Sequence, residues 1–300
     1  MSIQVPNAIS RTARYMAFFR ALESARGRMA LFDDRFAPCF LTSGLHAAVV
    51  AARIPGVGAL LERYVDERWP GAWSSGVSRT RVIDSWVAEA VGAGTEQVVI
   101  LGAGFDCRAL RLGALADVPV FEVDRPTLLS DKRHRLRRVE APERSNLIDV
   151  PVDFLRDDVG SRLQGAGLRR SERTLFLWEG VTNYLDADAV EAVFKLVQQV
   201  GAAGSRIIFT YVHADVLKGT FPAPGLAKLF ARLAASGEPW TFGFRPDEIG
   251  AYLSERGLRL LIDLGAAEYR RLAMGPRADG LVGYEFYRVA MAEVVGARDA

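Results

Sequence analysis

The sequence has little cysteine and little histidine, with two cysteines and three histidines among 300 residues. Cys39 and Cys107 lie far apart and lack the spacing of metal ligands, so we expect neither a disulfide framework nor a metal site. No apolar run is long enough to cross a membrane, and the N-terminus does not resemble a signal peptide. These absences predict a soluble, cytoplasmic protein.

An excess of charge of one sign is also missing. The chain has 38 lysines and arginines against 36 aspartates and glutamates, a formal net charge of +2. Neither nucleic acid nor a membrane is therefore an expected partner. The densest basic run, residues 132–138, falls on a predicted helix and is interpreted as its solvated face rather than as a phosphate site. Half of the residues are hydrophobic, enough for the core of one α/β domain over residues 1–300.

Between residues 97 and 124 the sequence contains a strand, a glycine turn, a helix and a second strand. The first apolar run ends at Leu101 and is followed by Gly102 and Gly104, and the second ends at Asp124. Glycine lets the backbone approach a ligand that a Cβ would exclude, and a carboxylate at a strand tip can accept both hydroxyls of a ribose. This pattern predicts a site for a cofactor that contains a nucleoside.

Two residues of the turn indicate which class of nucleoside cofactor the site favours. The dinucleotide fingerprint G-x-G-x-x-G has Cys107 at its third glycine position here, and Asp106 lies just inside the expected helix start. A carboxylate there disfavours a pyrophosphate but accommodates a sulfonium cation. A simpler role for Asp106 is to favour the helix dipole, worth about 0.3–1 kcal/mol. The turn therefore favours S-adenosylmethionine, and an NAD-dependent oxidoreductase is the weaker alternative.

Strand and helix patterns alternate after this turn, as is typical of a doubly wound parallel sheet. Because the strands are uniformly apolar, we expect both faces of the sheet to be covered. Two closing strands would complete a Rossmann-like, seven-stranded methyltransferase sheet, whereas a six-stranded parallel sheet would favour a dehydrogenase. The expected strands are 97–101, 118–123, 147–154, 174–178, 206–212, 259–264 and 283–294, and the expected helices are 125–139, 158–164, 187–201 and 246–256.

Residues 1–92 have helical patterns and are predicted to form an N-terminal helical cap. Arg20, Arg79 and Arg81 are charged exceptions on its largely apolar stretches. Such helices can simply pack on the sheet edge, but these arginines favour a role in covering the cofactor.

Residues 213–245 form an insertion after the fifth strand, rich in glycine, proline and apolar residues. Insertions at this point lie at the carboxyl edge of the sheet, where ligands bind, so we interpret this segment as a candidate lid. Its apolar members suit a hydrophobic small molecule: Phe221, Leu226, Leu229, Phe230, Trp240 and Phe242.

Four motifs, in this order and spacing, resemble the leucine carboxyl methyltransferase family, specifically its bacterial branch of S-adenosylmethionine-dependent O-methyltransferases. They are LGAGFDCRALRL, FEVDRP, DFLRDD and LWEGVTNYL, and further likeness at RALES, LFDDRFA, SRTRVID and FGFRPDEIGAYLSERGL extends the resemblance over most of the chain.

The resemblance implies that the two glycines of the turn face the cofactor and that Asp124 binds its ribose. It implies that Arg79 holds the methionine carboxylate, with Arg20 as a second contact, and that Glu179 lies near the methionine moiety. One of Asp157 or Asp158, beside Leu155, would lie near adenine.

The chain departs from the family pattern at two positions. Arg35 stands where the family usually has proline, and Asn183 stands where methionine is frequent before Tyr184. The side chain at 183 is expected near the acceptor pocket, so this departure bears on the substrate.

Methyl transfer from a sulfonium is an in-line displacement, and a carboxylate acceptor is already ionised at neutral pH and needs no base. A phenol would benefit from one, and His213, after the fifth strand, is the candidate, although a loop role is the simpler interpretation. Tyr211 is expected near the same cleft. Tyr184 can reach the cleft or pack in the core, and Glu179 needs a cation, from the cofactor or from a structural salt bridge.

The sequence thus predicts an S-adenosylmethionine-dependent O-methyltransferase for a carboxylate of a small metabolite or polyketide-like acid, as in natural-product biosynthesis. A phenol O-methyltransferase and a non-catalytic cofactor-binding protein of the same fold are the alternatives.

Overall fold

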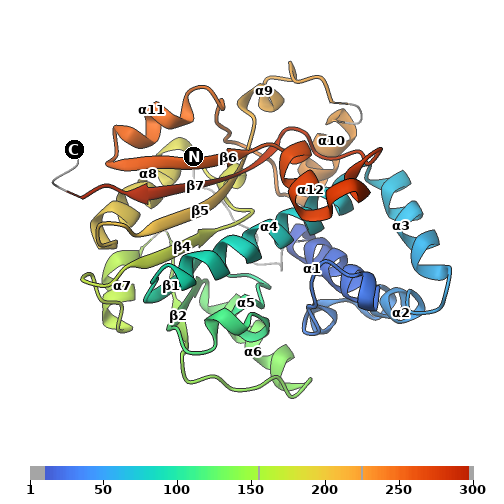
Figure 1. Ribbon diagram of the computed structural model, residues 1–300, viewed down its shortest axis with the longest axis horizontal. Helices are drawn as coiled ribbons and strands as arrows, with labels where there is room; N and C mark the ends of the chain where they lie inside the picture. The colour runs from blue at the N-terminus through green and yellow to red at the C-terminus, as the bar shows by residue number, and fades with distance from the viewer. Residues whose placement is uncertain (1–10, 155, 224–225, 297–300) are drawn as a thin grey trace.

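The computed structural model describes residues 11–154, 156–223 and 226–296, so Leu155 lies outside the described residues. The described strands form one sheet in the order β3-β2-β1-β4-β5-β7-β6 (Figure 1). β1 to β5 are parallel, and β7 runs antiparallel between β5 and β6. Their bounds are β1 Gln97–Leu101, β2 Val120–Asp124, β3 Leu147–Pro151, β4 Thr174–Trp178, β5 Arg206–Val212, β6 Leu258–Leu264 and β7 Tyr287–Val294. The predicted seven-stranded methyltransferase sheet is confirmed.

One face of the sheet is covered by α7 (Val159–Gly165), α8 (Ala187–Val200) and α11 (Ile249–Ser254). Its core centres on Phe194 of α8, whose ring packs against Trp178 at 5.6 Å and Phe209 at 5.2 Å between centroids. Such edge-to-face contacts add about 0.5–1.5 kcal/mol each beyond burial.

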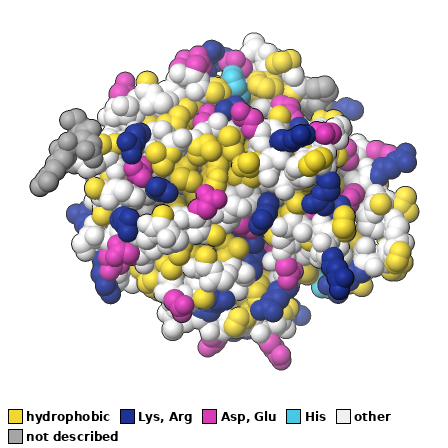
Figure 2. Space-filling model, in the orientation of Figure 1, with side chains coloured by type: hydrophobic (Ala, Val, Ile, Leu, Met, Phe, Trp, Pro, Cys, Tyr) yellow, Lys and Arg dark blue, Asp and Glu magenta, His cyan; other side chains and the backbone are white. Residues whose placement is uncertain are grey.

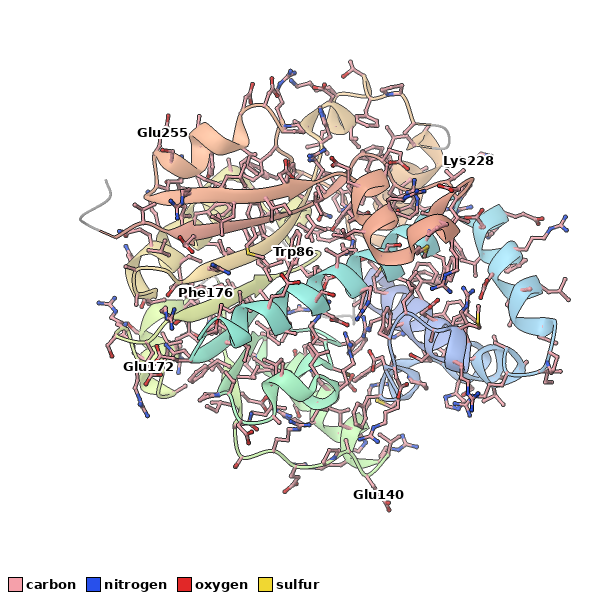
Figure 3. All side chains as sticks on the ribbon, viewed as in Figure 1. Trp86, Glu140, Glu172, Phe176, Lys228 and Glu255 are labelled. Carbon is pink, nitrogen blue, oxygen red and sulfur yellow. The ribbon has the colours of Figure 1, made fainter. Side chains whose placement is uncertain are left out.

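The other face is covered by α4 (Ala72–Gly92) and α12 (Ala266–Met274). Figure 3 labels Trp86 on α4 and Phe176 on β4, which belong to the cores on opposite faces of the sheet.

The expectation that both faces of every strand are covered is wrong at β3. Within β3 only Val150 is buried, and Asp149 is exposed. β3 is an edge strand paired with β2 alone, and the helices on its two faces cover it only in part. Residue 149 also carries an ion pair with Arg133 of α6 (Pro126–Arg137), at the surface of the molecule.

The N-terminal helices α1 (Arg11–Ser24), α2 (Ser43–Ala51) and α3 (Val57–Arg68) lie at one end of the sheet (Figure 1). They share a core with Phe105 and Leu110, which follow β1, and α4 packs on both this core and the sheet. The predicted helical cap is therefore joined to the sheet by continuous packing.

The insertion, residues 213–245, contains α9 (Ala214–Leu217) and α10 (Leu226–Ser236). Its aromatic side chains pack on Phe286 and Tyr287 at the start of β7. Arg232 of α10 donates to the Arg68 carbonyl at 2.8 Å, and Thr12 Oγ1 donates to Glu238 at 2.7 Å. The insertion thus contacts the sheet, the C-terminal end of α3 and the N-terminal end of α1.

The run 132–138 is not wholly the solvated face that the sequence predicts. Lys132 is buried, and its Nζ lies 2.8 Å from a carboxylate oxygen of Glu122 on β2. A lysine can enter a core only when such a partner compensates the loss of hydration. On the face shown in Figure 2, cationic and anionic side chains are interspersed. Among the described helices, none has the length and apolarity needed to cross a membrane.

Candidate functional site

The glycine turn and Asp124 meet at the carboxyl ends of β1 and β2. Gly102 has φ +67°, and a Cβ on it would lie 2.8 Å from Cγ2 of Val181. Gly104 has φ +45°, and its N–H donates to Asp124 Oδ2 at 2.8 Å. The Arg125 N–H donates to Oδ1 at 2.7 Å, and burial raises the pKa of this carboxyl. A carboxylate has about four acceptor positions, so two are left for the hydroxyls of a ribose.

Glu179 follows β4 and accepts hydrogen bonds on both oxygens. Nε of Arg79, from α4, donates to Oε1 at 2.8 Å, and Nη1 of Arg108 lies 2.8 Å from Oε2. Burial alone would raise the pKa of Glu179, but attraction to Arg108 and Arg79 outweighs it and lowers the pKa to about 2. The Arg79 guanidinium also lies 4.7 Å from the ring centroid of Tyr287. The cation that Glu179 requires is thus supplied within the chain.

Asp106 precedes the helix instead of lying inside it. α5 begins at Arg108 and has four residues, with Cys107 as its N-cap. The Asp106 carboxylate accepts the Arg108 backbone N–H at 2.6 Å and forms an ion pair with the guanidinium of the same residue. This attraction outweighs burial and lowers its pKa to about 2. The sequence places Asp106 just inside the helix start. The structure instead places it two residues before the helix, where Arg108 binds its carboxylate.

A chain of buried charges extends from this site into the N-terminal helices. Asp84 of α4 accepts from Arg108 at 2.7 Å and from Arg111 at 2.6 Å. Nε of Arg111 lies 3.8 Å from Asp34, which accepts from Arg20 at 2.8 Å. Four arginines face four acids in this chain: Arg20, Arg79, Arg108 and Arg111 with Asp34, Asp84, Asp106 and Glu179. Its formal charges therefore cancel.

Arg20 contributes a further contact to the glycine turn. Its Nη2 donates to the carbonyl of Phe105 at 2.6 Å. Arg20 thus contacts the glycine turn and pairs with Asp34. Arg81, which the sequence analysis groups with Arg20, is exposed.

Asp157 and Asp158 lie in the segment after β3. This segment starts beside Asp124, because the N–H of Val152 donates to the Asp124 carbonyl at 3.0 Å. Asp157 accepts from the Asp153 N–H at 2.8 Å and from Arg162 at 2.7 Å. Asp158 caps α7 by accepting the Ser161 N–H at 2.6 Å. Both carboxylates have local structural partners, and Asp124 lies next to the segment that holds them.

Tyr211 is not at the cleft where the sequence places it. Its ring is fully buried in the core formed with Phe209 and Phe244, and its hydroxyl donates to Asp263 at 2.7 Å. Burial and then this carboxylate raise the pKa of Tyr211. Successive side chains of a strand alternate between faces, and position 211 points into the sheet core.

His213 and Tyr184 lie in two different settings. His213 is the N-cap of α9, its Nδ1 accepts the Asp215 N–H at 3.2 Å, and its ring lies 5.2 Å from Phe221. The Tyr184 hydroxyl has Thr12 and Trp240 as neighbours, and burial raises its pKa to about 12. Tyr184 thus lies at the contact between the insertion and α1.

Sequence reasoning missed Arg108, Arg111 and Asp84. A signal was present, because each is a charged residue on an otherwise apolar stretch, as Arg79 is. It also did not predict the environment of Asn183, which is buried with its Nδ2 lacking a hydrogen-bond partner among the described residues.

These groups fit the cofactor that the sequence favours. Guanidiniums suit a carboxylate, Glu179 suits an ammonium or sulfonium, and Asp124 with the glycine turn suits a ribose. The site thus presents both signs of charge, as a zwitterionic amino-acid moiety requires.

The family whose model is described as leucine carboxyl methyltransferase matches residues 13–198. A protein of Frankia alni, provisionally named an S-adenosyl-L-methionine-dependent methyltransferase, is 38% identical over 287 residues, covering 93% of this chain and 95% of that protein. A similarly named protein of Mycolicibacterium smegmatis is 33% identical over 247 residues, covering 78% of this chain and 80% of that protein.

Among solved structures, a provisionally named methyltransferase from Thermobifida fusca superposes with a TM-score of 0.60 at 18% identity, covering 98% of this chain and all of that one. This likeness concerns the fold, which agrees with the sheet order described above. Family match, relatives and fold agree, and the chain therefore belongs to the leucine carboxyl methyltransferase family and is an S-adenosyl-L-methionine-dependent methyltransferase.

Proposed function

We propose that the protein methylates an oxygen atom of a small hydrophobic molecule and that this oxygen belongs to a carboxylate. The observation that carries the proposal is the composition of the region between Glu179 and the insertion. This region contains aromatic rings and hydrogen-bond donors, and its carboxylate is occupied by two arginines. An acceptor that arrives already ionised suits such a region, because it needs donors and no base.

The residues around the glycine turn would hold the cofactor. Arg79 would bind the methionine carboxylate and Glu179 the adjacent ammonium, in exchange for part of the pairing between them. Asp124 would bind the ribose, with Gly102 and Gly104 leaving room for close approach. When bound, S-adenosylmethionine supplies an electrophilic methyl group and a neutral thioether as the leaving group.

Asp106, Arg20 and the segment after β3 would support this site from its margins. Asp106 holds Arg108 in place against Glu179, and Arg20 fixes the turn through the Phe105 carbonyl. Asp157 would lie near adenine, since the segment that holds it begins beside Asp124.

Methyl transfer depends on alignment of the acceptor oxygen with the methyl group and on the exclusion of water from the site. The insertion would cover the site through Trp240, whose ring packs edge-to-face on Phe286, the residue before β7, with 5.9 Å between the ring centroids. An apolar cover strengthens the electrostatic contacts beneath it and suits a hydrophobic acceptor.

The experiment is methylation of matched acids and phenols by the purified protein, read by product mass. We expect methyl esters from aryl and alkyl carboxylates such as 2-naphthoate and decanoate. Methyl ethers from 2-naphthol alone would instead favour the phenol activity, with His213 as the base to test by His213→Ala. Methyl on nitrogen or carbon only, or cofactor binding without any turnover, would contradict the proposal.

A further inference from the structure

Asn183 has a buried amide that the fold itself does not use fully. The residue lies on the 3₁₀ turn Thr182–Tyr184, four positions after Glu179, and is 1% exposed. Its Nδ2 has no hydrogen-bond partner among the described residues. A buried donor without a partner is costly, so its retention calls for a ligand that it binds.

A chain of hydrogen bonds leads from the backbone to this amide. The Gly180 N–H donates to Thr210 Oγ1 at 2.8 Å, and that hydroxyl lies 3.3 Å from the Tyr287 hydroxyl. The Tyr287 hydroxyl in turn donates to Asn183 Oδ1 at 3.4 Å. The carbonyl end of the amide therefore faces Tyr287, and the Nδ2 end is buried with no hydrogen-bond partner among the described residues.

The surroundings place the free Nδ2 between the cofactor residues and the insertion. The Tyr287 ring carries the Arg79 guanidinium on its face and lies 6.4 Å from the Trp240 ring. The Thr241 N–H donates to the Asn183 carbonyl at 2.8 Å, so the insertion lies directly against this residue. The nearby carboxylate of Glu179 is engaged by Arg79 and Arg108. Asn183 thus offers a neutral donor beside a group of ion pairs whose formal charges cancel.

We propose that Asn183 is a specificity-determining residue for the acceptor and that its Nδ2 donates to one oxygen of the acceptor carboxylate. This inference rests on the proposed function. The other acceptor oxygen forms the O–CH₃ bond as the S–CH₃ bond breaks, the electron pair of that bond remains on sulfur, and no proton is transferred. A neutral amide orients the carboxylate and leaves its nucleophilic oxygen without a competing ion pair.

The test compares Asn183→Asp, which replaces the donor with an anion, and Asn183→Leu, which removes the donor without adding charge. Gln164→Glu, on the exposed side of α7, is the matched amide-to-acid control. Each variant is assayed with 2-naphthoate and decanoate as acids and 2-naphthol as the phenol. Calorimetry with S-adenosylhomocysteine measures the cofactor site separately, and thermal melting reports folding.

We expect Asn183→Asp to raise the KM for the carboxylates on the order of ten- to a hundredfold, the cost of losing a hydrogen bond to a charged group. The affinity for S-adenosylhomocysteine, and any KM measurable for 2-naphthol, should remain within about threefold, since neither depends on a donor at position 183. Asn183→Leu should give a smaller rise for the acids, and Gln164→Glu none.

A second measurement uses the wild-type protein, in case the variants do not fold. In the complex with S-adenosylhomocysteine, the side-chain amide NMR signals of Asn183 should shift on titration with 2-naphthoate. Suppose that the wild type forms methyl esters. An unchanged KM in folded Asn183→Asp, or an amide signal that does not shift, would then overturn the inference but not the proposed function. A wild type that methylates no oxygen would overturn the inference together with the proposed function.

Discussion

At the scale of single residues, Glu179 depends on two guanidiniums at once. Replacing it by glutamine puts an amide NH₂ group opposite either Arg79 or Arg108 and leaves both arginines with less compensation. Hydrogen bonds between charged groups contribute about 1.5–3 kcal/mol, so we expect Glu179→Gln to weaken S-adenosylhomocysteine binding by about ten- to a hundredfold. Calorimetry measures this, with exposed Glu255→Gln as the control. Unchanged affinity would place the amino-acid moiety elsewhere.

The same carboxylate gives a pH dependence with a definite sign. The pKa values of Glu179 and Asp106 are about 2, below the ordinary values near 4 of unfolded carboxyls. The stability that they contribute is therefore fully present above pH ~4 and is lost as the pH falls through about 2.

Urea unfolding at pH 7, 5, 4 and 3 measures this dependence. We expect Glu179→Gln to reduce the loss of stability below pH ~4, because one buried carboxyl with a lowered pKa is then absent. If the variant lost as much stability between pH 4 and pH 3 as the wild type does, the ion pairs of Glu179 would not govern acid unfolding.

At the scale of elements, the glycine turn depends on a conformation that other residues adopt poorly. Gly102→Ala would strain a residue at φ +67° and place a Cβ 2.8 Å from Val181. We expect a loss of about 1–3 kcal/mol in the free energy of unfolding, the typical cost of such backbone strain. Gly113→Ala is the matched control, since it has no atom within 4 Å of its added Cβ and no positive φ. Equal stability of the two variants would refute the argument.

The elements also differ in how well the sequence predicts them. β1, β4 and β5 have their predicted bounds, since each is a short apolar run with polar residues at its ends. β7 starts at Tyr287 instead of position 283, because Tyr284 and Phe286 pack against the insertion. The helix after the glycine turn shrinks to one turn for a tertiary reason, because Arg108 pairs there with both Asp106 and Glu179.

The candidate site is predictable where one local segment builds it and not where distant segments meet. Gly102, Gly104 and Asp124 are recognisable from a single βαβ pattern. The partners of Arg108 come from α4 and from the end of β4, and sequence spacing does not indicate such pairings. Tyr211 is misplaced for a related reason, because the orientation of a strand residue follows from register, which the sequence leaves open.

At the scale of the whole molecule, the buried charge chain connects the N-terminal helices to the sheet. Asp84 is its central acid, since it binds both Arg108 and Arg111 and is 3% exposed. Asp84→Asn would leave these arginines undercompensated in the interior, which typically costs about 3–5 kcal/mol. We expect a lowered urea midpoint and weakened S-adenosylhomocysteine binding together. Asp117→Asn, at an exposed position, is the control.

Separate effects of Asp84→Asn on stability and on S-adenosylhomocysteine affinity would contradict this prediction. If Asp84→Asn lowered stability but kept full affinity for S-adenosylhomocysteine, the chain would serve packing only and would not hold Glu179 in position.

The position of β7 has a consequence for how the protein is made. β7 follows the other described strands of the sheet along the chain, yet it lies inside the sheet, hydrogen-bonded to β5 on one side and β6 on the other. Nascent chains generally fold from the N-terminus onward, but here β6 can join the sheet only through a strand that leaves the ribosome after it. β6 must therefore wait for β7 before it can join the sheet, and loss of β7 would separate β6 from the other strands.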